Sequence, residues 1–439
     1  MSGAERLEIL RDLLGDAHRA LDLQFGFELW DGSVVPGNLP ASAMRIVIGR
    51  ENVVAALLRR PKLDTLINAH VAGLLELRNG TLFDLAAQRP QGKVGRRLRG
   101  LSKGKALKAA YHFLRAPADM PRPMDRPREG TGGRDGRPST NKANIAYHYD
   151  VSNAFYRLFL DPEMVYTCAY FQPEWHDDLA RAQRDKLDMI CRKLRLKPGE
   201  RLLDIGCGWG ALICYAAQHY GVKATGVTLA EEQAALAREK IAALGLQDRV
   251  EVILKDFTQM EGEFDKISSI GMFEHVGIAN HPTYFQTVHR LLKPRGLYLH
   301  HTIARRAKRS GRAFGRLKPE ARAVMRYIFP GAELDHLGMS VANLERFGFE
   351  VHDVEAWREH YQRTTRLWWE NLNARRAEAE AEVGPETTRA WLLYLAGVSL
   401  GFERGVIGVN QTLASRRTAP RTVRSSDRKA LVHDRRPRR

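Results

Sequence analysis

Apolar and polar residues follow two alternating patterns in the second half of this 439-residue chain. Short apolar runs predict buried strands, and the segments between them have helical spacing; the strands fall at 201–206, 223–229, 250–256, 264–272 and 297–303, the helices at 210–221, 230–245 and 282–296. Such alternation favours an α/β fold with a parallel sheet and helices on both faces. Ligands of such sheets bind at the carboxyl ends of the strands, so we expect the chemistry there.

The first 115 residues have a different pattern. Leu7, Leu10, Leu13, Leu14 and Leu21 fall near one face of a predicted helix. Segments 27–37, 44–49 and 72–87 resemble short strands interrupted by Gly, Pro and Asn. We predict a small α+β domain at 1–115 with no residue that suggests chemistry, a larger domain at 144–414, and between them a flexible linker at 116–143, rich in Pro, Gly, Arg and Asp.

The basic residues gather in three stretches. The net charge is +18, and a charge of this size favours a polyanionic partner, either nucleic acid or an anionic membrane. Residues 92–108 hold seven basic residues and no acid, residues 304–326 nine and one, and residues 415–439 ten and two. The last stretch lacks apolar periodicity and is predicted to be a disordered tail. The other two mix apolar and basic residues, a pattern suited to anionic lipid, where each cation is worth about 1 kcal/mol.

Targeting and cysteine content suggest a reducing compartment. No apolar run reaches the roughly 18 residues of a spanning helix. The first 20 residues carry acids and lack a compact apolar core, so we expect no secretory signal and a cytoplasmic protein. The four cysteines form no CxxC pair and no zinc-finger spacing, which disfavours disulfides and a metal site. Cys168 could still be a nucleophile or a packed side chain.

The glycine-rich stretch LLDIGCGWGAL at 202–212 has two interpretations. Gly206, Gly208 and Ala211 satisfy a dinucleotide fingerprint, whereas Gly206, Gly208 and Gly210 satisfy the D-x-G-x-G-x-G loop that admits S-adenosylmethionine. Asp204 favours the second, because a carboxylate at the strand end can orient the amino-acid end of that cofactor. A tight turn without a ligand is the third alternative.

Seven segments together resemble the cyclopropane fatty acid synthases and the related mycolic acid cyclopropane synthases. In chain order between residue 144 and about 412 they are NIAYHYDVSNAFYRLFLDPEMVYTCAYF, LLDIGCGWGAL, GVTLAEEQ, SIGMFEHVG, LHHTI, YIFPGAEL and EHYQRTTRLWWENL. The resemblance implies a Rossmann-like class I methyltransferase domain, and the first 115 residues loosely resemble the lipid-binding extension of the phospholipid-acting members. It also implies a homodimer.

The resemblance implies that the methyl group of S-adenosylmethionine is transferred to a cis double bond of a lipid acyl chain. The resulting carbocation is deprotonated, the family's base being a bound bicarbonate, and the ring closes. Carried onto this sequence, the bicarbonate residues are Cys168, Glu274, His301, Ile303 and Tyr361. Cys168 then lines an anion site and is not a nucleophile, since the alkene is the nucleophile.

The cofactor positions implied by the resemblance are Tyr166, Thr167, Gly206, Gly208, Thr228, Leu229, Gln233, Asp256 and Phe257. Thr228 stands where an acid usually holds the ribose, and Gln233 or a nearby Glu is the substitute. We expect the aromatic rings of Tyr166, Tyr170 and Phe273 to stabilise the cation. No metal is expected.

Three other functions remain open. An RNA methyltransferase would suit the charge, but SIGMFEHVG replaces the Asn/Asp-Pro-Pro-aromatic motif of amino methylation, so we expect no nucleic acid partner. A non-catalytic lipid-binding protein would not need the full set of site residues. A lipid C-methyltransferase uses the same carbocation and yields a methyl-branched or methylene chain. We predict an unsaturated phospholipid substrate, reached at the inner face of an anionic membrane without spanning it.

Overall fold

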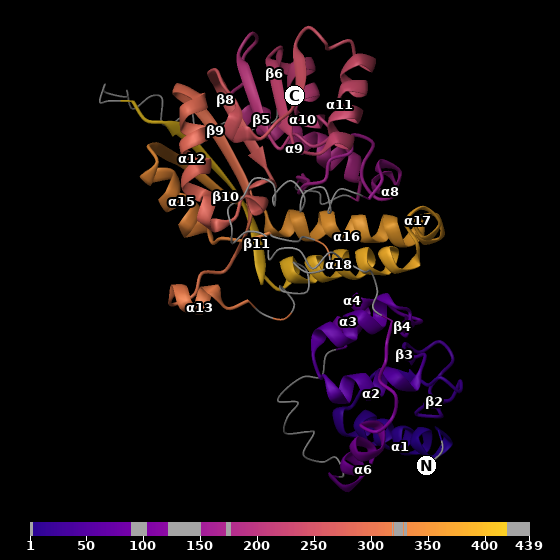
Figure 1. The fold of residues 1–439 in the computed structure, drawn as a ribbon. Coiled ribbons are helices and arrows are strands. Elements are labelled where there is room, and N and C mark those ends of the chain that lie inside the picture. Colours follow the sequence, from indigo (N-terminus) through magenta and orange to yellow (C-terminus); the bar gives the residue numbers. More distant parts are fainter. Residues whose placement is uncertain are drawn as a thin grey trace. The chain divides into compact units, whose positions relative to one another are not determined.

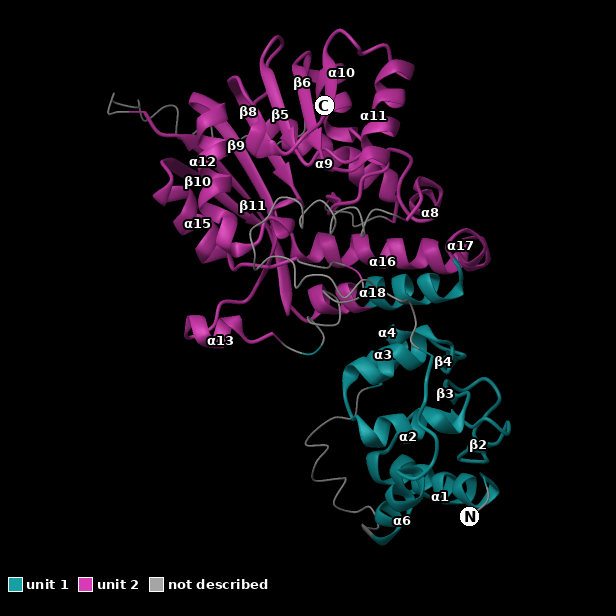
Figure 2. Cartoon of the chain, viewed as in Figure 1, with its two compact units in different colours: residues 1–127, 318–323, 384–396 teal, residues 128–317, 324–383, 397–439 magenta. Residues whose placement is uncertain are grey.

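The computed structural model describes residues 3–88, 103–121, 151–172, 177–317 and 332–418, together with Pro319 and Ile328. The chain divides into two compact units, residues 1–127, 318–323 and 384–396 in unit 1 and the remaining residues in unit 2 (Figure 2). Within the described ranges, no helix has both the length and the apolarity needed to cross a bilayer. The predicted linker, beyond residue 121, and the predicted tail, beyond residue 418, lie outside them.

Unit 1 combines a four-stranded sheet with helices. The strand order is β2-β1-β3-β4, with β1 parallel to β3 and the other pairs antiparallel. Its elements are α1 (Gly3–Leu21), β1 (Gly26–Glu28), β2 (Val34–Val35), β3 (Arg45–Ile48), α2 (Glu51–Arg59), α3 (Leu63–Val71), β4 (Leu75–Arg78), α4 (Leu82–Ala87) and α6 (Lys103–Phe113) (Figure 1). Residues 51–59 and 63–71 are helices that the pattern did not predict, and the predicted strand 72–87 is a strand followed by a capped helix.

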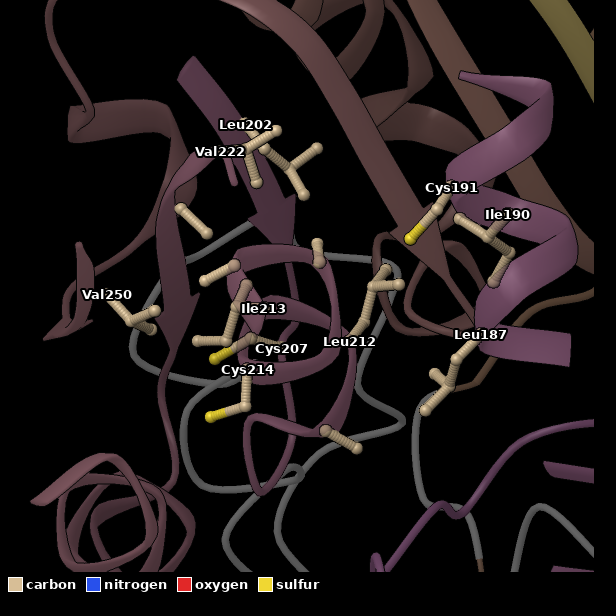
Figure 3. Close-up of a cluster of buried hydrophobic side chains, with 14 of the residues drawn as sticks. Leu187, Ile190, Cys191, Leu202, Cys207, Leu212, Ile213, Cys214, Val222 and Val250 are labelled. Atoms are coloured by element: carbon tan, nitrogen blue, oxygen red, sulfur yellow. The ribbon is translucent and has the colours of Figure 1, made fainter. Parts of the chain in front are cut away.

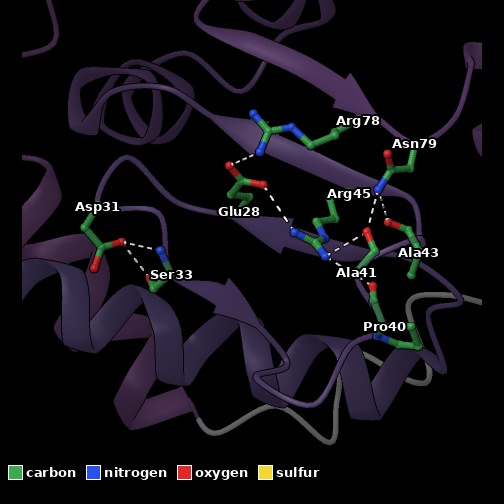
Figure 4. Close-up of polar contacts among 9 residues, drawn as sticks. All are labelled: Glu28, Asp31, Ser33, Pro40, Ala41, Ala43, Arg45, Arg78 and Asn79. Atoms are coloured by element: carbon green, nitrogen blue, oxygen red, sulfur yellow. Dashed lines mark hydrogen bonds and ion pairs between the residues drawn. The ribbon is translucent and has the colours of Figure 1, made fainter.

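A buried carboxylate joins three strands of this unit. Glu28 on β1 is 9% exposed and forms ion pairs with Arg45 on β3 and Arg78 on β4 (Figure 4). Two guanidinium groups compensate one buried carboxylate, which satisfies the charge that burial alone would penalise. The apolar core lies between α1, α2 and α6, where Leu10, Val53 and Phe113 are buried.

Unit 2 contains a seven-stranded sheet in the order β10-β11-β9-β8-β5-β6-β7. Its strands are β5 (Arg201–Ile205), β6 (Lys223–Thr228), β7 (Val250–Leu254), β8 (Phe264–Ile270), β9 (Leu292–Arg305), β10 (Phe349–Ala356) and β11 (Ile407–Arg416). Strands β5 to β9 pair in parallel, as predicted. One edge of the sheet is mixed, because β11 pairs antiparallel with both β9 and β10, a pairing that the strand–helix alternation did not indicate.

Helices cover both faces of this sheet (Figure 1). The helical elements are α8 (Asn153–Arg157), α9 (Leu179–Lys193), α10 (Ala211–Tyr220), α11 (Glu231–Ala243), η2 (Phe257–Gln259), η3 (Phe273–His275), η4 (Ile278–Asn280), α12 (His281–Leu291), α13 (Gly311–Gly315), α15 (Leu337–Arg346), α16 (Arg358–Ala374), α17 (Arg376–Val383) and α18 (Pro385–Glu403), the last divided between the units. Adjacent residues of β5 enter different cores: Leu202 belongs to the cluster that contains Ile190 and Ile213 (Figure 3). Leu203 belongs to the cluster that contains Phe285. Period-2 side-chain alternation produces this two-sided burial.

Two predicted boundaries differ from the structure. The helix expected to reach residue 296 ends at Leu291, and β9 starts at Leu292. Pro294 has no amide hydrogen to donate and disfavours helical backbone in the residue before it, so the helix stops early. Ser415 and Arg416, placed at the start of the tail, pair with Glu350 and Phe349 as the end of β11.

Candidate active site

A cavity of about 330 Å³ lies in unit 2 at the carboxyl ends of β5, β6 and β8. Ten of the eleven residues expected to bind the cofactor line it: Tyr166, Thr167, Asp204, Gly206, Gly208, Thr228, Leu229, Gln233, Asp256 and Phe257. Gly210 does not. It is the N-cap of α10 with φ 81°, and a Cβ there would approach the Cβ of Ala237 at 3.2 Å. Its role is to start the helix behind the cavity.

The first glycine of the loop permits a close backbone turn. Gly206 has φ 79°, and an added Cβ would lie 2.6 Å from Cγ of Met272. Gly208 has φ 54°, but an added Cβ would meet no protein atom within 4 Å, and Gly208 lines the cavity. Both positions therefore favour glycine for backbone reasons, and only Gly206 also requires it for packing.

The carboxylate of Asp204 is held at the end of β5. It is 4% exposed, and its Oδ1 accepts a hydrogen bond from Ser268 Oγ at 2.7 Å. Burial raises its pKa to about 6, opposed by the hydrogen bond from Ser268 and by the charge of Lys186. At neutral pH the carboxylate is ionised and faces a cavity in which a cationic ligand group would be stabilised.

A threonine, Thr228, and not an acid is the last residue of β6. Thr228 Oγ1 donates to Gln233 Oε1 at 3.0 Å, and both side chains are buried against the cavity. Glu231 and Glu232 are exposed and do not line it. Just beyond the end of β7, Asp256 is the N-cap of η2: its Oδ1 accepts hydrogen bonds from the amide and the hydroxyl of Thr258.

Lys186 is a cavity residue that the sequence reasoning missed. It lies on α9, is 2% exposed, and donates from Nζ to Thr167 Oγ1 at 2.8 Å. No described carboxylate lies within ion-pairing distance of it, and burial lowers its pKa to about 8, opposed by the charges of Asp161 and Asp204. The available signal was its spacing, since Ala182, Lys186 and Ile190 share the buried face of one helix.

The five residues expected to hold bicarbonate do not line this cavity. They come from four places in the chain. Cys168, Ile303 and Tyr361 belong to a buried cluster with Trp357, the His301 ring lies 5.7 Å from the Trp357 ring, and Glu274 accepts a hydrogen bond from the amide of Ile303. The two regions are continuous along the chain, because Thr167 and His275 line the cavity and precede or follow Cys168 and Glu274 directly. On each of these two segments, a residue that lines the cavity is therefore the sequence neighbour of a residue expected to hold bicarbonate.

Glu274 is fixed by one oxygen. Its Oε1 accepts from the amide of Ile303 at 2.5 Å and from Thr302 Oγ1 at 3.3 Å, while Oε2 is buried without a hydrogen-bond partner among the described residues. Burial raises the pKa of Glu274 to about 7, and the charge of Asp335 adds to this, against the hydrogen bond from Ile303. The carboxyl group is thus poised between its two protonation states near neutral pH.

His301 is 1% exposed and lies opposite Gln411 in the sheet. Its Nδ1 is 3.1 Å from Gln411 Nε2, and its Nε2 has no partner among the described residues. Burial lowers the pKa of His301 well below its ordinary value, and the charges of Lys186 and Lys193 add to the effect. The ring is therefore neutral at physiological pH.

The Cys168 side chain is a hydrogen-bond donor. It is fully buried, and its Sγ contacts the carbonyl oxygens of Ala169 at 3.3 Å and Trp357 at 3.8 Å. Burial raises its pKa well above the usual range, so the thiol stays protonated and is a poor nucleophile. The Tyr361 ring stacks on Phe402 with centroids 4.6 Å apart.

Of the three aromatic rings expected near the cation, Tyr166 alone lines the cavity. Its ring lies 5.3 Å from that of Tyr156 and 5.1 Å from that of Trp368. Tyr170 instead stacks on His360, and Phe273 packs in the core against His281, with ring centroids 4.8 and 4.2 Å apart, respectively. The aromatic residues that line the cavity are Tyr166, Trp209, Phe257 and Tyr284.

A parallel sheet with an antiparallel strand inserted at one edge, and a glycine loop after its central strand, defines the class I S-adenosylmethionine-dependent methyltransferase fold. The family model for mycolic acid cyclopropane synthetase matches residues 137–412, and the chain belongs to this family. It is a family of S-adenosylmethionine-dependent enzymes that act on lipid acyl chains. The resemblance seen in the sequence is confirmed.

Individual relatives agree. A probable fatty acid methyltransferase of Pseudomonas putida is 39% identical over 91% of this chain and 94% of its own length. The cyclopropane-fatty-acyl-phospholipid synthase of Escherichia coli K12 is 37% identical over 61% of this chain and 66% of that enzyme. The crystal structure of mycolic acid cyclopropane synthase CmaA1 complexed with SAH and CTAB is 35% identical, covers 63% of this chain and 98% of its own, and superposes with a TM-score of 0.59.

Proposed function

We propose that the chain forms a cyclopropane ring on the cis double bond of an unsaturated phospholipid acyl chain, using S-adenosylmethionine and a bicarbonate base. The observation that carries the proposal is the cavity lined by ten candidate cofactor residues, beside two buried polar atoms that have no hydrogen-bond partner in the described part of the chain, Glu274 Oε2 and His301 Nε2. Buried polar atoms without partners are rare, and they fit a ligand that both accepts and donates hydrogen bonds.

The cavity is suited to the charged ends of S-adenosylmethionine. We propose that Asp204 orients the ammonium group, that Lys186 binds the carboxylate, and that Gln233 contacts the ribose. Lys186 supports this because an ammonium group has three protons to donate, and one hydrogen bond, to Thr167, accounts for one of them. A carboxylate beside it would give the buried cation the counter-ion it lacks among the described residues.

The cluster around Trp357 is suited to a small anion with a proton. We propose that His301 donates from Nε2, that Glu274 positions the anion through Oε2, and that Cys168, Tyr361 and the backbone of Ile303 complete the site. Bicarbonate bound there supplies the base. The alkene attacks the methyl carbon, the C–S bond breaks with its electrons on sulfur, and the transferred methyl then loses a proton as its C–H pair closes the ring. The net gain is one CH2.

Mass spectrometry of acyl chains tests the reaction. The protein is incubated with S-adenosylmethionine and vesicles that contain cis-unsaturated phospholipid. A gain of one CH2 with loss of the alkene and a cyclopropyl proton signal by NMR supports the proposal. Unchanged lipid, with the cofactor still bound in a calorimeter, contradicts it and directs attention to another substrate, nucleic acid included. A chain that binds no cofactor would support a lipid-binding role without catalysis.

Lipid C-methylation is a second candidate function. The relative that matches 91% of this chain is named a fatty acid methyltransferase, whereas the phospholipid cyclopropane synthase matches 61%. Loss of a different proton from the same carbocation would give a methyl-branched or methylene chain. The same mass gain with the alkene retained or moved identifies this outcome.

We also propose that unit 1 docks on an anionic membrane through the outer face of α6. Leu107, Tyr111 and Leu114 form a stripe along this helix and its end and are 71%, 57% and 46% exposed. Lys108 is exposed beside them, and Arg115 lies 3.6 Å from the centre of the Tyr111 ring. The described part of the helix has no acid in its first turn, and basic charge beside an apolar stripe matches anionic headgroups.

Vesicle co-sedimentation tests this surface. Replacing Leu107 and Leu114 with serine is expected to weaken binding to phosphatidylglycerol vesicles several-fold, because the change removes apolar area that inserts beneath the headgroups. Leu244→Ser in unit 2, 40% exposed, is the matched control and should leave binding unchanged. Equal loss in both variants would contradict the assignment of α6. The homodimer remains a prediction for analytical ultracentrifugation.

A further inference from the structure

Behind His301 lies a series of interacting polar side chains from three separate elements, of which Gln411 is buried and Lys193 and Glu355 are partly exposed. Lys193 at the end of α9 donates from Nζ to Gln411 Oε1 on β11 at 2.7 Å and forms an ion pair with Glu355 on β10. Gln411 is 1% exposed, and its Nε2 faces His301 Nδ1. None of these three residues lines the cofactor cavity.

The donor and acceptor properties of these side chains fix the orientation of the Gln411 amide. An ammonium group can only donate, so the amide atom facing Lys193 must be the oxygen. The atom facing His301 is then the NH2 group, which can only donate as well. Nδ1 of His301 must accept this hydrogen bond, so it carries a lone pair and no proton. A neutral imidazole with a bare Nδ1 carries its proton on Nε2.

We propose that Gln411, oriented by Lys193, is a positioning residue that holds His301 as the Nε2–H tautomer. His301 then presents a donor to the site and has no free lone pair with which to take a proton. The role of this donor toward bicarbonate rests on the proposed function, and the tautomer does not. On the proposed function, in which bicarbonate is the base, His301 serves the site as a hydrogen-bond donor and not as the base.

Nitrogen NMR on the full-length protein tests the tautomer directly. Histidine labelled with nitrogen-15 is read by long-range proton–nitrogen correlation, and His301→Gln identifies the signal among the 15 histidines. In the unmodified protein, Nδ1 is expected to be unprotonated and Nε2 protonated. Gln411→Glu places an acceptor opposite Nδ1 and should reverse the pattern. Asn410→Asp introduces the same charge on the neighbouring residue of β11 and should leave it unchanged.

A second variant and a kinetic readout protect the test. Lys193→Met frees the amide to rotate, so the His301 signal should become a mixture of tautomers even if Gln411→Glu does not fold. Where lipid activity is measurable, Gln411→Glu should lower kcat roughly 10- to 100-fold, by analogy with residues that orient metal-binding histidines, with the KM for S-adenosylmethionine unchanged. The inference is overturned if Nδ1 is protonated in the unmodified protein. It is also overturned if neither Gln411→Glu nor Lys193→Met changes the tautomer of His301. Absence of lipid activity alone overturns the proposed function and leaves the tautomer result standing.

Discussion

Replacing Lys186 by methionine tests the assignment of the cofactor cavity most directly. The side chain keeps its length and apolar stem and loses the ammonium group, and since the site is buried the fold should tolerate the change. A hydrogen bond to a charged group is worth about 1.5–3 kcal/mol. At 1.4 kcal/mol for each factor of ten, loss of the contact to the cofactor carboxylate should weaken S-adenosylmethionine binding by roughly 10- to 150-fold.

Titration calorimetry with two ligands separates this contact from general damage. Decarboxylated S-adenosylmethionine lacks the group that Lys186 is proposed to bind, so its affinity should change little or rise in Lys186→Met. Lys197→Met, an exposed lysine beyond the end of α9, removes the same charge and should leave both affinities unchanged. The reasoning is refuted if Lys186→Met weakens both ligands equally, or weakens neither.

Two further predictions concern stability and the glycine loop. Burial raises the pKa of Glu274 from 4.5 to about 7, so between these pH values the folded chain retains a proton that the unfolded chain releases. The free energy of unfolding should therefore fall as the pH rises from 4.5 to about 7. Glu274→Gln should remove this fall, as measured by urea titrations at several pH values. Parallel pH profiles in the two proteins would contradict this. Gly206→Ala should cost about 1–3 kcal/mol of stability through its positive φ and its contact with Met272, whereas Gly208→Ala should cost less and weaken cofactor binding, as denaturation and calorimetry together would show.

The strands that the sequence predicted are those that alternate with helical segments. β5, β6 and β8 are buried on both faces, and this alternation indicated them although β6 reads KATGVT and β8 reads FDKISSI. β10 was missed because it reads FEVHDVEA, in which charged residues occupy an edge strand with one half-exposed face. Local composition cannot distinguish such a strand from a loop, since its stability comes from pairing with β11.

The site residues that lie close together in the sequence were predictable. Those that are far apart in the sequence and meet only in the folded structure were not. The glycine loop and the strand-end residues form short sequence motifs, and most of these residues line the cavity. Gln411 and Lys193 are 218 positions apart, and their meeting depends on the antiparallel insertion of β11, which no local pattern indicated. Lys186 carried a weak signal, a charged residue on a buried helix face, whose meaning depends on the cavity beneath it.

The burial of all four cysteines has a practical consequence. Alkylating reagents attack thiolates, and burial raises the pKa of Cys214 to about 11 and those of Cys168, Cys191 and Cys207 well above their usual value. All four belong to unit 2, so the rate at which they are alkylated in native buffer measures how often that unit opens. A cysteine introduced at exposed Leu107 would react first, and a fluorophore there could follow docking without removal of any native thiol.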